Sequence, residues 1–430
     1  MAPVTNSTAR DHLNDAHGVG SAAAPGAAGA WKLQAKDLIL TAPPRTASMY
    51  IPPWPGLSPS DLIGARPVST LPYPFNAPVQ SAFCVARSGI YHLFRALQLK
   101  PGEKVLMPDY HSGNEVAAAR AAGAEIIFYP ILRNLEPDLE TLAMLAAEGP
   151  RVIYVIHYLG WPQPMKEIQT LARQSGAIVI EDCALALLSE HQGTPLGATG
   201  DYSVFCIYKT LPVPNGGLLV QNNTALPGLG KLSLEPCPPL TAIGRTAELA
   251  LEAFRSRWNG AGAALFDLKQ SARRRLRAAE VRSVPVGDIG WDVNNVNVAM
   301  SPLGNRVIRC VDHTEIRNRR RTNFLWLREK LRGKVMMLRE DLEPGICPLF
   351  FPILVRHKHE AAEALRKSGI QAVEFWNDPM KDAALGPAAR YLRAHVLELP
   401  VHQGVTQQQL EYIAQEIGHL NPEPAPVGIS

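Results

Sequence analysis

The chain has 430 residues, more than one hydrophobic core usually serves, so a large domain with a smaller companion is expected. Its hydrophobic content of 46% and charged content of 19% are those of an ordinary globular protein. The net charge of +4 is too small to indicate nucleic acid or an anionic membrane as a partner. No apolar run approaches the roughly 20 residues that a membrane-spanning helix needs.

The cysteines and the N-terminus indicate a cellular compartment. The six cysteines show neither CxxC nor zinc spacing, so no metal site is expected. Three of them lie among apolar residues, which favours buried thiols under reducing conditions. The N-terminus lacks the basic start and apolar core of a secretory signal, and the cytoplasm is the expected location.

Residues 1–78 are expected to form an N-terminal arm. Residues 1–30 are rich in small and polar residues and cannot build a packed core, which predicts disorder. Residues 43–78 are rich in proline, which denies the backbone donors that helices and sheets require. This stretch is predicted to be extended, with Trp54 and Tyr73 anchoring it on the protein's own surface or on a partner subunit.

An alternation of helices and strands over residues 79–235 indicates a large domain. Continuous apolar strands between amphipathic helices predict a mostly parallel sheet that is covered on both faces. The expected strands are residues 104–108, 124–131, 151–158, 177–182, 202–208 and 216–221. The expected helices begin near Ser88 and cover residues 114–123, 139–148 and 165–176.

The remainder divides into a helical insertion and a smaller unit. Residues 236–285 contain two predicted helices, at 241–258 and 264–280. Residues 286–425 begin with a long predicted helix near 300–333 and continue as a small α/β domain. Its expected strands are residues 350–356 and 370–375, and its expected helices are residues 359–369 and 406–420.

An acid and an amine follow two neighbouring strands. Asp182 ends the apolar run VIED, and Lys209 comes directly after YSVFCIY. Ligands of parallel sheets bind at the carboxyl ends of the strands. Such a pair is what a pyridoxal phosphate enzyme needs, because the amine holds the cofactor as a Schiff base and the acid keeps the pyridine nitrogen protonated.

The sequence at the start of the first helix of the large domain is a modest indication of a phosphate-binding site. Ser88 and Gly89 would place free amide donors and a positive dipole end at a helix N-terminus. From these two residues alone, an ordinary serine N-cap is the favoured explanation, and a phosphate site is the alternative.

Four stretches in order resemble the DegT/DnrJ/StrS family of pyridoxal phosphate aminotransferases. The resemblance covers roughly residues 80–425 and implies a fold type I transferase, α/β, whose large domain has a seven-stranded, mostly parallel sheet and is joined to a smaller C-terminal α/β domain. The four stretches are IHYLGWPQPMKEI, VIEDCALALLSEHQGTPLGATGD, YKTLPVPNGGLLVQNN and LPVHQGVTQQQLEYI.

The resemblance implies a role for each matching residue. Lys209 stands at the Schiff-base lysine and Asp182 at the partner of the pyridine nitrogen. Ser88 and Gly89 stand at the phosphate loop. Asn297 matches an asparagine that the partner subunit contributes to the phosphate, which implies a homodimer with shared active sites; a turn residue in an asparagine-rich loop is the alternative.

Several positions depart from the family pattern. Leu185 replaces a polar residue near the cofactor's phenolic oxygen, and Cys206 replaces a serine that contacts phosphate, where a cysteine is the weaker donor. Ser112 stands where an aromatic residue usually stacks on the ring, so His111 is expected to stack instead, with Tyr110 as the alternative. Ala299 replaces a usual arginine.

The predicted function is transfer of an amino group from a donor such as glutamate to a keto acceptor, possibly a keto-sugar nucleotide. Two alternatives remain open. One is a pyridoxal phosphate lyase or dehydratase, against which Lys209 argues because the family's sugar dehydratases carry histidine there. The other is a non-catalytic or regulatory relative, which the substitutions at Leu185 and Ser112 motivate.

Overall fold

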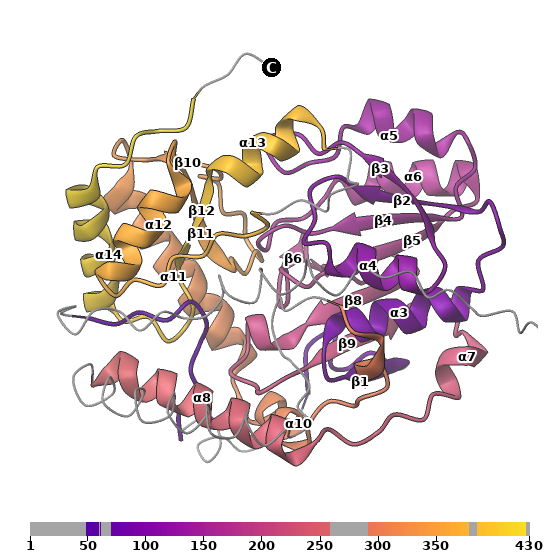
Figure 1. The fold of residues 1–430 in the computed structure, drawn as a ribbon, viewed down its shortest axis with the longest axis horizontal. Helices are drawn as coiled ribbons and strands as arrows, with labels where there is room; N and C mark the ends of the chain where they lie inside the picture. Colours follow the sequence, from indigo (N-terminus) through magenta and orange to yellow (C-terminus); the bar gives the residue numbers. More distant parts are fainter. Residues whose placement is uncertain (1–48, 60, 62–69, 259–290, 378–384, 427–430) are drawn as a thin grey trace, which may run out of the picture.

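A seven-stranded sheet forms the centre of the large domain (Figure 1). In the computed structural model, which describes residues 49–59, 61, 70–258, 291–377 and 385–426, the strand order is β1-β9-β8-β5-β4-β2-β3. Pairing is parallel from β8 to β3 and antiparallel at β8–β9 and β1–β9, which confirms the predicted, mostly parallel sheet. The strands are β1 (Gln80–Phe83), β2 (Lys104–Pro108), β3 (Glu125–Tyr129), β4 (Val152–Ile156), β5 (Ile178–Asp182), β8 (Tyr202–Cys206) and β9 (Gly217–Gln221).

Helices cover both faces of this sheet. The connections through α3 and α4 lead from β1 to β2 and on to β3, at the far edge of the sheet. The connections through α5 and α6 lead back in the opposite direction, from β3 to β4 and then to β5. Because parallel crossovers are right-handed, α3 and α4 lie on one face and α5 and α6 on the other. The bounds are α3 (Ala86–Leu97), α4 (Asn114–Ala121), α5 (Leu139–Ala146), α6 (Met165–Ser175) and, after β9, α7 (Pro227–Gly230).

Cover on both faces explains why the central strands are apolar throughout. Every residue of β4 and β8 is buried, so neither strand shows the alternation of a half-exposed strand. The helices, by contrast, are apolar on one side only: in α6 the buried residues are Ile168 and Ala172, four positions apart.

The smaller unit contains a three-stranded antiparallel sheet with the order β10-β11-β12. Two predictions for this part of the chain were wrong. The long helix near 300–333 is two helices, because Val311 leaves the helical conformation and Asp312 caps the next helix by accepting from the Glu315 amide. Residues 370–375 make only isolated bridges at Ile370 and Val373 and form no strand. The bounds are α10 (Pro302–Cys310), α11 (His313–Leu331), β10 (Met336–Met337), β11 (Phe350–Leu354), α12 (Lys358–Lys367), α13 (Pro387–His395), β12 (Val396–Pro400) and α14 (Gln407–Leu420).

The proline-rich segment lies against its own chain. Trp54 packs edge-on against Phe350, with ring centroids 5.0 Å apart, and the Tyr73 hydroxyl donates to the carbonyl of Gly197. The predicted aromatic anchors are therefore confirmed. Residues 1–30 and the second insertion helix at 264–280 lie outside the described residues; the first insertion helix is α8 (Pro239–Arg257). None of the helices in the described ranges is long and apolar enough to cross a membrane.

Candidate active site

The carboxyl ends of β2, β4, β5 and β8 meet at one edge of the large sheet, because these four strands are parallel. The register aligns Ile156 at the end of β4 with Asp182 at the end of β5, and the His157 amide donates to the Asp182 carbonyl at 2.9 Å. A single 3₁₀ turn, η1 (Ile207–Lys209), follows β8. The sheet therefore brings the predicted acid and amine to the same edge.

Asp182 is held from two sides. The Tyr154 hydroxyl donates to its Oδ2 at 2.6 Å, and the Ala184 amide donates to its Oδ1 at 2.8 Å. Burial raises the pKa of Asp182, and these two hydrogen bonds and the charge of Lys209 only partly oppose that effect. Tyr154 lies on β4 and was not singled out from the sequence, since a tyrosine inside an apolar strand normally indicates core.

Lys209 is a buried amine, with only 7% of its surface exposed. Its Nζ lies 5.4 Å from the centroid of the Phe375 ring, and its charge acts on Asp182. The next residue, Thr210, is fixed by the smaller domain: its carbonyl accepts from Arg320 Nη2 at 3.1 Å and from Gln403 Nε2 at 3.0 Å. The smaller domain thus holds the turn that carries Lys209.

Ser88 and Gly89 lie in the first turn of α3. The helix begins at Ala86 after Val85, so the reading of Ser88 as the N-cap was wrong. A Cβ on Gly217 would lie 2.3 Å from the Ala86 nitrogen, so only glycine allows the start of β9 to approach this turn so closely. Cys206, at the end of β8, is buried nearby in the sheet.

The residue before Asp182 has a structural role. Glu181 accepts hydrogen bonds from the backbone amides of Gly197, Thr199 and Gly200, and its Oε2 lies 2.8 Å from His157 Nε2. The His157 Nδ1 accepts from the Gln163 amide, which places the ring proton on Nε2. Burial alone would raise the pKa of Glu181, but His157 and the amides together lower it.

Among the described residues, one group has the composition of a metal site: His157, Glu181 and Cys183. The hydrogen bonds just described already use His157 Nε2 and the Glu181 oxygens. The hydrogen bonds of His157 and Glu181 therefore join the end of β4 to the turn before β8. This turn follows the hairpin of β6 (Glu190–His191) and β7 (Thr194–Pro195).

Asn297 is itself exposed, but it lies between the buried residues Val296 and Val298. Its carbonyl accepts from the Glu235 amide at 2.7 Å, and its side chain bonds to His92 on α3. A role toward the phosphate of a partner subunit stays a prediction.

Comparison with known proteins identifies the large domain. Residues 79–229 match the DegT/DnrJ/EryC1/StrS aminotransferase family. The resemblance predicted from the sequence motifs is thereby confirmed for this segment. GDP-perosamine synthase of Escherichia coli O157:H7 is 31% identical over 140 residues, which are 30% of this chain and 37% of that enzyme. UDP-4-amino-4-deoxy-L-arabinose–oxoglutarate aminotransferase of Shewanella sediminis is 26% identical over 191 residues, 44% of this chain and 43% of that enzyme.

Solved structures extend the likeness to most of the fold. PseC of Helicobacter pylori, an aminotransferase involved in the biosynthesis of pseudoaminic acid, superimposes with a TM-score of 0.60 at 16% identity, covering 86% of this chain and 98% of that one. A family aminotransferase of Brucella abortus gives a TM-score of 0.55 at 16% identity, covering 80% and 86%. The fold type I prediction is confirmed, whereas the sequence match spans less than half the length of the two curated relatives.

Side-chain contacts fix the loop after β2. Ser112, expected from the resemblance to stand where an aromatic residue stacks on the cofactor, donates from its amide and its hydroxyl to the buried carboxyl of Glu115. Burial and the nearby Asp182 raise the pKa of Glu115. The Ser-x-x-Glu spacing before a helix is a capping-box pattern and could have predicted this contact. The His111 ring lies parallel to Phe128 at 5.2 Å, so its stacking on a cofactor stays a prediction.

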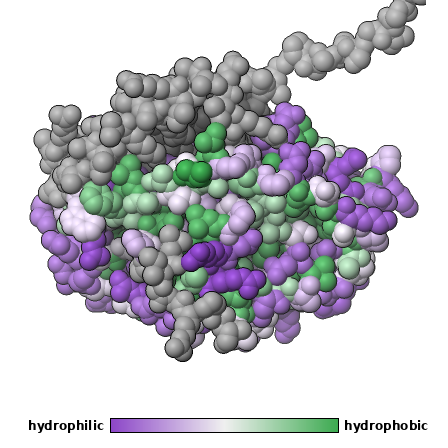
Figure 2. All heavy atoms as spheres, turned by 90° about the horizontal axis from the view of Figure 1, so that it is seen from below, coloured by the Kyte–Doolittle hydropathy of each residue, from purple (hydrophilic) through white to green (hydrophobic). Residues whose placement is uncertain are grey.

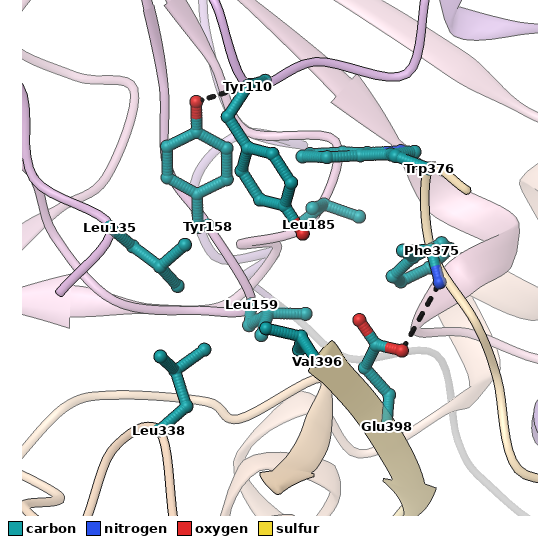
Figure 3. Close-up of a pocket in the computed structure, with 10 residues that line it drawn as sticks. All are labelled: Tyr110, Leu135, Tyr158, Leu159, Leu185, Leu338, Phe375, Trp376, Val396 and Glu398. Carbon is teal, nitrogen blue, oxygen red and sulfur yellow. Dashed lines mark hydrogen bonds between the residues drawn. The ribbon is translucent and has the colours of Figure 1, made fainter. Parts of the chain in front are cut away.

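Leu185, which the resemblance places near the cofactor's phenolic oxygen, lines a small cavity between the two domains (Figure 3). Tyr110 and Trp376 form one wall, with ring centroids 4.7 Å apart in an edge-to-face arrangement. Glu398 of β12 reaches the cavity from the opposite side and accepts from the Phe375 amide at 3.3 Å. Most of the side chains that line this cavity are apolar, and Glu398 is the only one of them with a carboxyl group.

Replacing Glu398 with glutamine should flatten the pH dependence of stability. Burial raises the pKa of Glu398 to about 8, although the charge of Lys358 opposes this. The folded chain therefore keeps a proton that the unfolded chain releases near its ordinary value of 4.5, and stability falls as pH rises between these two values. In urea denaturation from pH 5 to 8, the free energy of unfolding should fall less steeply for the variant than for the wild type, by up to ~1.4 kcal/mol per pH unit. Parallel profiles for Glu398→Gln and the exposed control Glu360→Gln would contradict this assignment.

Proposed function

We propose that the protein is a pyridoxal phosphate-dependent aminotransferase that moves an amino group from a donor such as glutamate to a keto acceptor. One observation carries the proposal: a buried amine at Lys209 and a buried carboxyl at Asp182 face the same strand edge, on a fold shared with aminotransferases. Burying an acid and an amine is unfavourable unless they serve each other or a ligand.

The residues at this edge fit pyridoxal phosphate. Asp182 would bind the pyridine nitrogen, and its raised pKa means that a cationic partner would stabilise the carboxylate that burial disfavours. Lys209 would hold the cofactor covalently, and the first turn of α3 with Ser88 and Gly89 would receive the phosphate. When bound, the cofactor supplies an electron sink for the bonds at the substrate carbon.

The chain's own groups would then position and move protons. Tyr154 and the Ala184 amide orient the Asp182 carboxylate, because each binds a different oxygen. Lys209 Nζ would carry the proton of the substrate carbon, since it is the amine nearest that position. Phe375 and Trp376 from the smaller domain cover the edge and limit the access of water.

A keto-sugar nucleotide is the acceptor that the relatives favour. Three curated relatives carry names that refer to GDP-, dTDP- and UDP-linked sugars. The lyase alternative is disfavoured because Lys209 is present where the family's dehydratases carry histidine. The non-catalytic alternative draws on the apolar surroundings of Leu185 and is decided by the experiment below.

The decisive experiment is a spectroscopic half-reaction. The full chain with added pyridoxal phosphate should show a visible absorption band, glutamate should bleach it with release of 2-oxoglutarate, and a keto-sugar nucleotide should restore it. Failure to retain the cofactor would overturn the proposal. Retention without a response to any amino donor would favour the non-catalytic alternative.

Replacing Asp182 with asparagine should lower the rate of amine transfer but raise the stability of the cofactor-free protein. Amine transfer should fall by about 10²-fold or more, because a neutral amide cannot hold the pyridine nitrogen protonated. The cofactor-free protein should unfold at a higher temperature, since a buried acid whose pKa is raised is replaced by a neutral group. Thermal melts and single-turnover rates measure both effects. Asp201→Asn, in the turn before β8, is the control and should leave the rate unchanged; an unchanged rate in Asp182→Asn would refute the role.

We further propose a homodimer in the cytoplasm. Asn297 is exposed, as a residue offered to a partner's site must be. Figure 2 views the side on which α8 lies, and Leu240, Ile243 and Trp258 in and just after this helix are each more than half exposed. Exposed apolar residues of this kind are typical of subunit interfaces. The six free cysteines are consistent with a reducing compartment.

A further inference from the structure

Two cysteines from distant parts of the sequence meet at the start of α3. Cys84 follows β1 directly and is fully buried, and Cys237 lies in the segment that leads to α8 and is 8% exposed. Together with Val85 and Val298 they form a small cluster that is separate from the two larger cores. Neither cysteine belongs to the candidate active site.

The two cysteine side chains are neighbours in this cluster. Their thiol groups are joined by a hydrogen bond, and Asn215 Nδ2 donates to Cys237 Sγ at 3.2 Å. The backbone around Cys84 is fixed, because its amide donates to the Val298 carbonyl and its carbonyl accepts from the Gly216 amide. The Asn215 side chain is fixed in turn, because its Oδ1 accepts from the Ser301 amide at 3.0 Å.

The environment makes the two thiols unequal. The hydrogen bonds from Cys84 and Asn215 lower the pKa of Cys237 to about 7, although burial alone would raise it. The same hydrogen bond, together with burial, raises the pKa of Cys84, and the charge of Arg87 opposes this only weakly. Cys183 and Cys347 differ from Cys237, because burial raises the pKa of both. Cys237 is thus the nucleophilic member of the pair and Cys84 its resolving partner.

We propose that Cys84 and Cys237 form a reversible disulfide when the protein meets a peroxide. The Cys237 thiolate attacks one oxygen of hydrogen peroxide, and the O–O bond breaks to give a sulfenic acid and hydroxide. The hydroxide becomes water by taking up the proton that the Cys237 thiol released when it ionised. Cys84 then attacks this sulfur and its thiol proton leaves with the departing hydroxide as water. Two thiols are oxidised by two electrons and one peroxide is reduced to two waters.

The bond would fasten the segment before α8 to the start of α3. Cys84 lies two residues before Ala86, where α3 begins, and Ser88 lies in the first turn of that helix. Because a disulfide between residues so far apart in sequence restricts the unfolded chain strongly, the oxidised protein should be the more stable form. This inference does not depend on the proposed enzymatic activity.

Peptide mapping of the oxidised full chain tests the proposal. Reduced protein is treated with a few equivalents of hydrogen peroxide, alkylated under denaturing conditions and digested without reductant. The digest should contain one peptide pair linked through Cys84 and Cys237, accessible thiols should fall from six to four, and dithiothreitol should restore them. The melting temperature of the oxidised form should rise by several degrees.

Three variants keep the result interpretable. Cys237→Ser should leave Cys84 alkylated, and Cys84→Ser should leave a sulfenic acid on Cys237 that dimedone traps. Cys310→Ser removes the partly exposed cysteine outside the pair and should keep the linked peptide. The proposal is overturned if Cys84 and Cys237 remain alkylated while Cys310 is oxidised, or if the linked protein melts at a lower temperature than the reduced one.

Discussion

Replacing Lys209 with alanine should abolish covalent retention of pyridoxal phosphate and lower amine transfer by about 10³-fold or more. The reason is that no other described lysine lies at the edge where β5 and β8 end: the second buried lysine, Lys358, donates to the carbonyls of Phe375 and Arg393 in the smaller domain. Sodium borohydride treatment of the loaded wild type, followed by peptide mapping, should place the cofactor mass on Lys209 alone.

Two further variants sharpen this test. Lys209→Arg keeps a positive charge beside Asp182 but cannot hold the cofactor, so it should fold and remain inactive. Lys166→Ala removes an exposed lysine on α6 and should leave labelling and activity unchanged. Label on Lys358, or equal labelling of wild type and Lys209→Ala, would show that the cofactor does not use this amine.

Replacing Arg320 with alanine should lower the free energy of unfolding by about 3 kcal/mol or more. Arg320 is fully buried on α11, and its guanidinium donates to the carbonyls of Thr210, Pro348 and Leu349. Alanine would remove a buried donor from each of these carbonyls, and the turn that carries Lys209 would keep, of its two hydrogen bonds from the smaller domain at Thr210, only the one from Gln403. Urea denaturation should detect the loss, and cofactor affinity should fall with it.

The adjacent residue provides the matched control. Arg319 lies on the same helix but is exposed, so Arg319→Ala should change stability by no more than about 0.5 kcal/mol. Arg320→Lys should recover only part of the loss, because an ammonium group cannot reproduce the planar fork of donors. A loss below about 1 kcal/mol in Arg320→Ala would mean that water satisfies the three carbonyls and that Arg320 is not what joins the domains.

The sequence predicted correctly those features that depend on residues close together in the chain. Continuous apolar strands predicted the covered sheet, because burial on both faces leaves no polar alternation. Asp182 and Lys209 could be paired from sequence because Asp182 ends one recognisable strand and Lys209 follows another closely, and parallel strands end at one edge. Predicted helix boundaries were wrong where a single side chain sets them. Asp312, for example, caps α11 and so divides what was predicted as one helix.

Contacts between distant residues could not be predicted in this way. The Arg320–Thr210 hydrogen bond joins residues 110 positions apart, and the cluster RNRRR reads from sequence alone as a solvated helix face. Tyr154 looks like a core residue until the register places its hydroxyl 2.6 Å from Asp182. Likewise, the family pattern did not indicate that Ser112 would donate to Glu115 or that the His111 ring would stack on Phe128.

The sequence by itself determined the fold class, because strand periodicity is written within a few neighbouring positions. Together with the family resemblance, the strand ends also predicted Asp182 and Lys209 as the acid and the amine of the site. The tertiary structure alone decided how Asp182 is held, what fixes the turn after Lys209, and that Cys84 meets Cys237. These contacts depend on the register between strands and on the packing of the two domains, and neither is encoded in any single stretch of the chain.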